Sequence, residues 1–305
     1  MKQRILVLGS EHFVAAGVHA ALYASDWAEP TAYSGPPDLL SDKHLAGVQA
    51  VFNGTMGSPA AIAATARALY GALGRIGADV RVVHLSSMTV YGSLRGEALE
   101  TAAMRTDLGA YGAAQVDAEL LASQYRHSVI LRPGCEYGPR CAQWSERIAR
   151  LLCSHRLGDL GAAGDGVCNL LFVDDLLKAI LASLRVQGID GHRFNLAMRS
   201  PPTWNEYFVQ LGRALGAVPI SRIGGRRLRL ETKLFAPPLK AMELIERRLR
   251  GQSRATPPPI TPSLLNLCNQ DITLNVERAE AAFDLAWTPL SEGLRQSAAA
   301  YHAIQ

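Results

Sequence analysis

The chain has 305 residues, 48% of them apolar, and a formal net charge of +4. This length and composition suffice for one large or two modest packed domains and exclude an intrinsically disordered chain. No run of about 18 apolar residues occurs, and the apolar start at 5–8 gives way at once to Gly9-Ser10-Glu11, so the sequence predicts neither a membrane span nor a signal-peptide core.

Short β-branched runs alternate with longer segments rich in Ala and Leu from residue 4 to about 195, which is typical of βαβ units and a parallel sheet. The predicted strands are Arg4–Leu8, Pro30–Ser34, Val48–Asn53, Val80–Ser86, Val129–Arg132 and Phe194–Leu196. The predicted helices lie near 15–24, 38–46, 59–76, 109–125, 141–156 and 174–186.

After residue 195 this regular alternation stops. Thr203 and Glu206 form a predicted capping box for a helix that runs to about Gly216. Segment 234–250 is predicted to be an amphipathic helix, since one face carries apolar residues and the opposite face carries charges. The apolar face comprises Phe235, Leu239, Met242, Ile245 and Leu249, and the charged face comprises Lys240, Glu243, Arg247 and Arg250. Prolines at 257–259 and 262 separate this helix from a last stretch that ends in a terminal helix.

Segment 222–250 concentrates positive charge. It holds nine Arg or Lys residues against Glu231, Glu243 and Glu246, which gives it a charge of +6. Such a strip is typical of a solvated helix face, and it also suits phosphorylated ligands, nucleic acid or a membrane surface. We expect no nucleic-acid partner, and we keep peripheral membrane contact through 226–250 as an alternative to the solvated face.

The five cysteines are scattered and form no Cys-x-x-Cys pair. They therefore predict neither a disulfide framework nor a zinc site, and no other residues have the paired spacing of metal ligands. We expect a cytoplasmic protein that binds no metal.

Several motifs occur in a fixed order along the chain. They are Ser86-Ser87-Met88-Thr89-Val90-Tyr91-Gly92, Tyr111-Gly112-Ala113-Ala114-Gln115, Leu131-Arg132-Pro133-Gly134, Gly164-Asp165-Gly166, Val173-Asp174-Asp175 and Trp287-Thr288-Pro289. This ordered set covers essentially the whole chain and resembles the extended short-chain dehydrogenase/reductases, the NAD-dependent epimerase/dehydratase-like family. The resemblance implies an α/β fold with a Rossmann-type doubly wound parallel sheet and a smaller C-terminal α/β substrate-capping region. It assigns 1–137 and 167–200 to the dinucleotide-binding domain, and 138–166 and 201–305 to the capping region.

The resemblance also implies an enzyme with a catalytic hydroxyl pair. Tyr111 matches the general acid/base, and Ser87 matches the hydroxyl that polarises the reacting carbonyl. The family has a Lys four residues after the Tyr, on the same helix face, but this chain has Gln115. Glutamine can hydrogen-bond a nicotinamide ribose, yet it carries no charge that would favour a phenolate. The alternatives are a working enzyme and a fold retained only for binding, and we favour the enzyme.

The turn after the first strand resembles the family's glycine-rich pyrophosphate turn, with His12 and Ala15 at the second and third glycine positions. The end of the second strand has neither the acid expected for NAD nor the base expected for NADP, so both cofactors stay open. The usual third strand also has no room before Val48. The candidate cofactor contacts are Gly9, Ser10, His12, Phe13, Ser34, Gly54, Thr55, Ser86, Tyr111, Gln115 and Pro133.

Two departures from the family's motifs narrow the choice of reaction and substrate class. Dehydratases of the family place an acid pair after the catalytic hydroxyl, where this chain has Met88 and Thr89. A nucleotide-sugar enzyme of the family has a diphosphate-binding arginine where this chain has Cys168. We therefore predict hydride transfer to or from an alcohol or ketone carbon of a non-nucleotide, apolar substrate. One alternative is a nucleotide-sugar epimerase with an altered diphosphate grip, which Arg222, Arg226 or Arg227 could supply. The other is a non-catalytic dinucleotide-binding protein. A homodimer is the default expectation for the family.

Overall fold

The structure, a computed structural model, describes residues 2–77, 79–250 and 257–303, and within these the side chains of 243, 244 and 247–250 are not described. The chain divides into two compact units. Unit 1 comprises Met1–Gly134, Val173–Arg199 and Leu274–Trp287. Unit 2 comprises Cys135–Phe172, Ser200–Thr273 and Thr288–Gln305.

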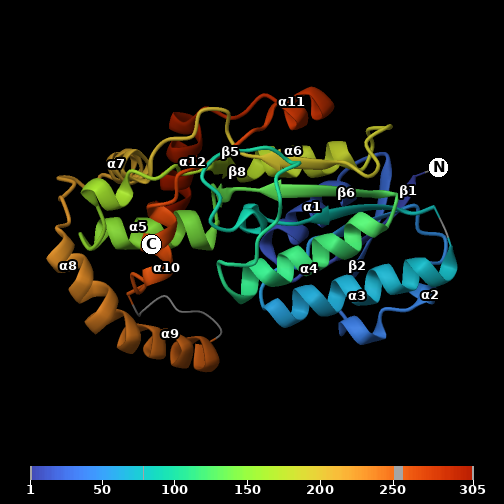
Figure 1. Ribbon diagram of the computed structural model, residues 1–305, viewed down its shortest axis with the longest axis horizontal. Helices are drawn as coiled ribbons and strands as arrows, with labels where there is room; N and C mark the ends of the chain where they lie inside the picture. Colours follow the sequence, from blue (N-terminus) through green and yellow to red (C-terminus); the bar gives the residue numbers. More distant parts are fainter. Residues whose placement is uncertain (1, 78, 251–256, 304–305) are drawn as a thin grey trace. The chain divides into compact units, whose positions relative to one another are not determined.

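Unit 1 contains a six-stranded sheet in the order β2-β1-β3-β4-β6-β9, in which every neighbouring pair is parallel (Figure 1). The strands are β1 (Gln3–Leu8), β2 (Ala28–Tyr33), β3 (Ala50–Asn53), β4 (Arg81–Leu85), β6 (Ser128–Pro133) and β9 (Arg193–Leu196), with the short β5 (Gly96–Ala98) outside this sheet. The α/β fold with a doubly wound parallel sheet is confirmed, and each of the six predicted strands overlaps an observed one.

Helices cover both faces of this sheet. The helices are α1 (Phe13–Tyr23), α2 (Asp42–Leu45), α3 (Pro59–Ile76), α4 (Ala110–Gln124), α6 (Val173–Ser183) and α11 (Glu277–Phe283). Helices α3 and α4 pack together over one core that includes Leu6, Val51 and Ile130. Helix α1 packs against α6, and α6 against α11. Because side chains alternate along a strand, Ile5 and Val7 point away from the α3–α4 core.

Strand β2 forms an edge of the sheet, and within the described residues no strand pairs with its outer side. This agrees with the absence of the family's usual third strand. The predicted helix at 38–46 is wrong in its extent: a 3-10 turn at Pro37–Leu39 and the short α2 occupy this region. Leu40 between them has extended backbone angles, which interrupts the helix.

Unit 2 is built around the parallel pair β7 (Cys135–Tyr137) and β8 (Leu170–Phe172). Its helices are a π-helical turn at Ala142–Glu146, α5 (Arg147–Cys153), α7 (Trp204–Ala214), α8 (Gly225–Leu230), α9 (Ala236–Arg250), α10 (Pro262–Cys268) and α12 (Leu290–His302), and β10 (Ile272–Leu274) ends where unit 1 resumes. Tilted aromatic rings pack in the interior, with the ring centroid of Trp204 5.3 Å from that of Trp144 and 5.7 Å from that of Phe208. The capping box of Thr203 and Glu206 at the start of α7 is confirmed.

Segment Leu274–Trp287 belongs to unit 1, although the sequence assigned it to the capping region. The physical reason is aromatic packing, because Phe283 of α11 lies with its ring 4.6 Å from that of Phe194 in β9. Within the described parts of the chain, none of the helices has both the length and the hydropathy needed to span a membrane.

Candidate active site

The carboxyl ends of β1 and β3 meet in unit 1 where the strand order reverses, the place where doubly wound folds bind ligands. Gly9 follows β1 with a φ of +75°, and a Cβ on it would lie 2.8 Å from Thr55 Cα and 2.9 Å from the Gly54 carbonyl carbon. No side chain fits at this point. The structure thus brings the predicted residues Gly9, Gly54 and Thr55 together.

Gly54, directly after β3, partly compensates for the missing third glycine in the turn after β1. A Cβ on Gly54 would lie 2.9 Å from the Cβ of Ala15, so glycine on the strand side makes room for alanine on the helix side. His12 is the N-cap of α1, but its side chain caps none of the helix N–H groups and lies instead near Gly57 and Glu11. The first turn of α1 therefore keeps uncapped N–H groups, which suit an anion such as a pyrophosphate.

On the β2 side, the hydroxyls of Ser10 and Ser34 are hydrogen-bonded at 2.9 Å. Phe13 at the start of α1 is exposed, and Pro133 is buried at the end of β6. The short side chains of the two serines leave this end of the turn accessible.

Tyr111 and Gln115 lie one turn apart on α4. Gln115 is fully buried, and its Nε2 donates to the Tyr111 hydroxyl at 3.1 Å. The other amide atom, Oε1, is buried and makes no hydrogen bond within the described part of the chain. Gln115 therefore takes the orienting contact with the tyrosine but not the charge of the family's lysine.

Ser87 lies beside the same helix. Its hydroxyl accepts a hydrogen bond from the Thr89 N–H at 3.2 Å and caps the 3-10 turn Met88–Tyr91. That turn packs on the start of α4, since a Cβ on Gly112 would lie 3.3 Å from the Thr89 carbonyl oxygen. Glycine at 112 thus lets the Ser87 turn approach the first turn of the helix that carries Tyr111.

Met56 is a site residue that the sequence analysis missed. Its sulfur lies 3.8 Å from both the Tyr111 hydroxyl and the Gln115 Nε2, and both groups can donate to it weakly. The signal was available, because Met56 directly follows the predicted contacts Gly54 and Thr55.

Three buried polar atoms suit a ligand at this place. Oε1 of Gln115 and the hydroxyls of Thr55 and Thr89 make no hydrogen bond within the described residues. Because buried polar atoms are nearly always hydrogen-bonded, this set fits a molecule that carries hydroxyls and amides. Together with the tight Gly9 turn, it fits a dinucleotide.

Beneath the site, His84 of β4 is held neutral. The Asn53 amide nitrogen and the Tyr70 hydroxyl lie 3.1 Å and 3.2 Å from its Nδ1, and because an amide nitrogen only donates, Nδ1 accepts. Burial lowers the pKa of His84 to about 4, although the charge of Glu119 acts in the opposite direction.

This shift predicts a loss of stability in acid. The unfolded chain takes up a proton with a pKa of about 6.5, so the contribution of His84 is complete above that pH and is lost as pH falls towards 4. The loss should amount to about 3 kcal/mol. The free energy of unfolding, measured with urea between pH 7 and pH 4.5, should fall less steeply with decreasing pH for His84→Gln than for the wild type. The control His192→Gln, at an exposed histidine, should behave as the wild type does. Equal slopes in all three would contradict the assignment.

Ser86, the remaining predicted cofactor contact, points into a buried network of charged side chains. Its hydroxyl donates to Glu119 at 2.8 Å, and Glu119 also pairs with Arg132 and with Arg193 at 3.1 Å. Burial raises the pKa of Glu119, but the hydrogen bonds and charge of Arg132 outweigh it and hold that pKa below its usual value. Glu119 lies one turn beyond Gln115, a spacing that the sequence analysis did not use.

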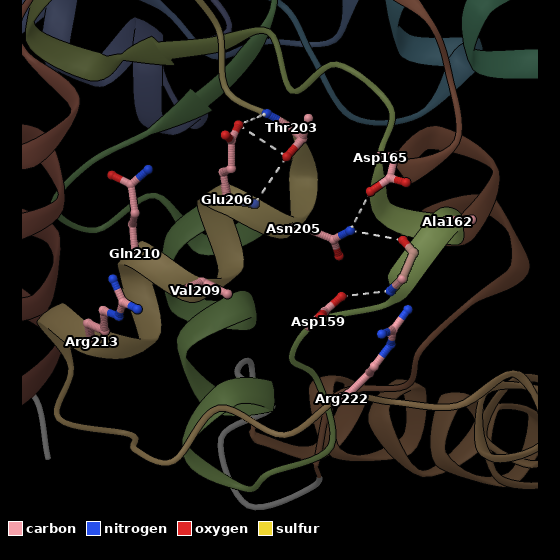
Figure 2. A pocket seen from close by; sticks show the side chains of 11 residues that line it. Asp159, Ala162, Asp165, Thr203, Asn205, Glu206, Val209, Gln210, Arg213 and Arg222 are labelled. Carbon is pink, nitrogen blue, oxygen red and sulfur yellow. Dashed lines mark hydrogen bonds between the residues drawn. The ribbon is translucent and has the colours of Figure 1, made fainter.

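Unit 2 contains an open groove of about 630 Å³ (Figure 2). None of the predicted catalytic or cofactor-binding residues lines it, whereas Arg222, a candidate for the altered diphosphate grip, does. Asn205 donates to Asp165 and to the Gly161 carbonyl, both at 2.8 Å, and Glu206 belongs to the capping box of α7. Asp159 accepts from the Gly161 N–H at 2.7 Å. These polar groups hold the loop and helix together, so the groove carries no site assignment.

Comparison with protein families supplies the identification. A sequence model of the NAD dependent epimerase/dehydratase family matches residues 42–197, about half of the chain, including Ser87, Tyr111 and Gln115. The chain belongs to this family. Its members are enzymes, and the predicted family membership is confirmed. The glycine turn at 9–15 lies outside the matched span.

Solved structures share the fold at low sequence identity. UDP-glucuronic acid 4-epimerase from Bacillus cereus, in complex with NAD, has 16% identity and a TM-score of 0.72, with 99% of each chain covered. RMD from Pseudomonas aeruginosa, complexed with NADPH, has 18% identity and a TM-score of 0.69, with 100% of each chain covered. The NAD dependent-NDP-hexosamine 5,6-dehydratase TunA has 17% identity and a TM-score of 0.74, with 99% of this chain and 98% of that chain covered. Comparison with curated proteins gives no match.

Proposed function

We propose that the protein is an NAD(P)-dependent oxidoreductase that moves a hydride to or from an alcohol or ketone carbon of a non-nucleotide, apolar substrate. The observation that carries this proposal is the Gln115–Tyr111 hydrogen bond combined with the unpartnered Oε1 of Gln115. One end of the amide orients the catalytic tyrosine, and the other end is free to accept from a ribose hydroxyl.

The roles of the residues follow from their donors and acceptors. A bound nicotinamide supplies or accepts the hydride. Tyr111 exchanges the proton of the substrate oxygen, and Ser87 donates a hydrogen bond to that oxygen. The first turn of α1 and Gly9 hold the pyrophosphate. Met56 moves aside so that the ligand reaches Tyr111 and Gln115.

Unit 2 supports a non-nucleotide substrate. Cys168, at the family's arginine position, is fully buried, and burial raises the pKa of its thiol well above the usual value. The neighbouring Asn169 amide donates to the Ile272 carbonyl at 2.8 Å and so serves the fold. Neither group offers the cation that a diphosphate needs.

The absence of an acid at Met88 and Thr89 disfavours elimination of water. The proposed enzyme acts as a cytoplasmic homodimer, which rests on the sequence prediction alone.

Calorimetric titration with NAD(H) and NADP(H) tests the proposal. We expect the wild type to bind one of the two cofactors, and Gln115→Leu to bind it roughly 3- to 10-fold more weakly because a single hydrogen-bonding group is lost. Met56→Ala should bind at least as tightly as the wild type, since the displaced thioether is gone. Apolar alcohols and ketones are then screened with the preferred cofactor.

Other results would change the function. A wild type that binds neither cofactor, with binding gained by Gln115→Lys, would make this a fold whose redox activity has been lost. Tight binding of a UDP-linked sugar would support the epimerase alternative. Cofactor binding without turnover of any alcohol, ketone or nucleotide sugar would favour the non-catalytic alternative.

A further inference from the structure

Residues 225–250 form one continuous helical segment, in which α8 passes through a π-helical turn at Glu231–Phe235 into α9 (Figure 1). The segment is attached to unit 2 by the buried side chains of Leu228, Glu231 and Ala236. Arg156 fixes this attachment, because its guanidinium forms an ion pair with Glu231 and also donates to the Pro258 carbonyl at 3.0 Å. The segment is therefore tied to its own unit along one side.

Of the apolar face predicted for this helix, Leu239 is half-buried and most of the other described side chains point outward. Five large apolar side chains are between 49% and 61% exposed, namely Leu230, Leu234, Phe235, Met242 and Ile245. Met242 and Ile245 are three residues apart and so adjacent on the helix surface. Ile245 lies nine residues after the buried Ala236, about half a turn around the axis, and thus faces away from unit 2. The side chains of Glu243, Arg247, Leu249 and Arg250, also assigned to the two faces, lie outside the described residues.

The charge beside these apolar side chains is positive. Exposed cations occupy the same stretch, namely Arg226, Arg227, Arg229, Lys233 and Lys240. Two acids of the segment have described side chains. Glu231 is buried against Arg156 and does not offset these cations at the surface, and Glu246 is half-buried and lies beyond Met242. The segment up to Met242 therefore presents exposed cations together with exposed apolar groups.

We infer that segment 226–245 is a docking surface for a lipid bilayer with anionic headgroups. A helix of this kind lies in the plane of the interface, with its apolar side chains at the acyl boundary and its cations among the headgroups. A nucleic acid would pair with the cations but leave the apolar side chains in water. A second copy related by twofold symmetry would place like charges against each other. The inference rests on this surface alone and does not depend on the proposed reaction.

Cosedimentation of the full chain with vesicles tests the inference. We expect binding to phosphatidylcholine vesicles that contain about a third phosphatidylserine, and much weaker binding to pure phosphatidylcholine. The double variant Arg229→Gln/Lys233→Gln should lower the partition coefficient roughly 10- to 30-fold, because each cation near an anionic surface contributes about fivefold. Met242→Ser/Ile245→Ser should weaken binding at low and at high salt, whereas the effect of the two cations should fade as salt rises.

Matched controls lie in unit 1, where Leu39→Ser and Arg67→Gln alter an equally exposed leucine and an exposed arginine. These two variants should bind vesicles as the wild type does, and all variants should keep the wild-type melting temperature because every position is at the surface. Three results would overturn the inference: no binding of the wild type to phosphatidylserine vesicles, equal binding to both vesicle types, or variants at 242 and 245 that change the oligomeric mass in light scattering while vesicle binding stays the same. Dinucleotide affinity, measured on the same variants, should not change, which separates this result from the proposed function.

Discussion

Replacing Glu119 by alanine should lower the free energy of unfolding by about 3 to 5 kcal/mol, because it leaves the buried charge of Arg132 without its partner. Both side chains are essentially inaccessible to water, and the Arg132 Nε lies 3.0 Å and 3.1 Å from the two carboxylate oxygens. Within the described residues, the acceptors left to Arg132 are neutral, namely the Tyr91 hydroxyl and the Glu100 carbonyl. Urea unfolding at pH 7 measures the loss.

Two comparisons separate this effect from a general weakening of α4. Asp117→Ala removes an exposed carboxylate from the same helix and should change stability by less than about 0.5 kcal/mol. The double variant Glu119→Leu/Arg132→Met should recover most of the loss, since a buried ion pair can often be replaced by apolar side chains of similar volume. If Glu119→Ala cost no more than Asp117→Ala, the network would not contribute to stability.

Tyr111→Phe should lower turnover of the alcohol or ketone found in the screen by on the order of 10² to 10⁴, the usual contribution of a general acid/base. The change removes one oxygen and keeps the ring, so dinucleotide affinity should change by less than about tenfold. Steady-state rates and cofactor titrations of the same preparation give the two readouts. Turnover above about a tenth of the wild-type value would remove Tyr111 from the acid/base role.

Gln115→Lys provides the opposite change at the same site. A cation beside the tyrosine hydroxyl favours the phenolate, so the pH at which turnover reaches half its maximum should move to lower pH. Gln115→Leu should not produce this shift, because it supplies no charge. A lysine variant with an unchanged pH profile would mean that the proton transfer does not depend on Tyr111.

The local patterns of the sequence were sufficient for much of the fold. Alternating β-branched and Ala/Leu-rich segments predicted the six strands of the parallel sheet. The short distance between Ser34 and Val48 predicted that the family's usual third strand is absent, and the structure accordingly has β2 at the edge of the sheet. The helix predicted at 38–46 failed because its pattern alone does not show that Leu40 is extended, which depends on how the chain leaves the edge strand.

Some contacts of the candidate site follow from the sequence, and others depend on the tertiary structure. The four-residue spacing of Tyr111 and Gln115 places both on one face of a helix, and the hydrogen bond between them follows from that spacing. The sequence places Met56 directly after the predicted contacts Gly54 and Thr55. Its contact with Tyr111, 55 residues away, depends on the tertiary structure, which brings the loop after β3 close to the tyrosine hydroxyl.

By itself, then, the sequence determined the order of strands and helices along the chain and the neutral Gln115 at the family's lysine position, and it predicted the hydroxyl pair Ser87 and Tyr111. Only the tertiary structure decided that Glu119 is the centre of a buried ion network, that the Met56 sulfur contacts the Tyr111 hydroxyl, and that five large apolar side chains of 230–245 are exposed. The reason is the range of the forces involved. Turns, helices and strand patterns depend on neighbours within a few residues, whereas burial, ion pairing and exposure depend on which distant segments the packed chain places side by side.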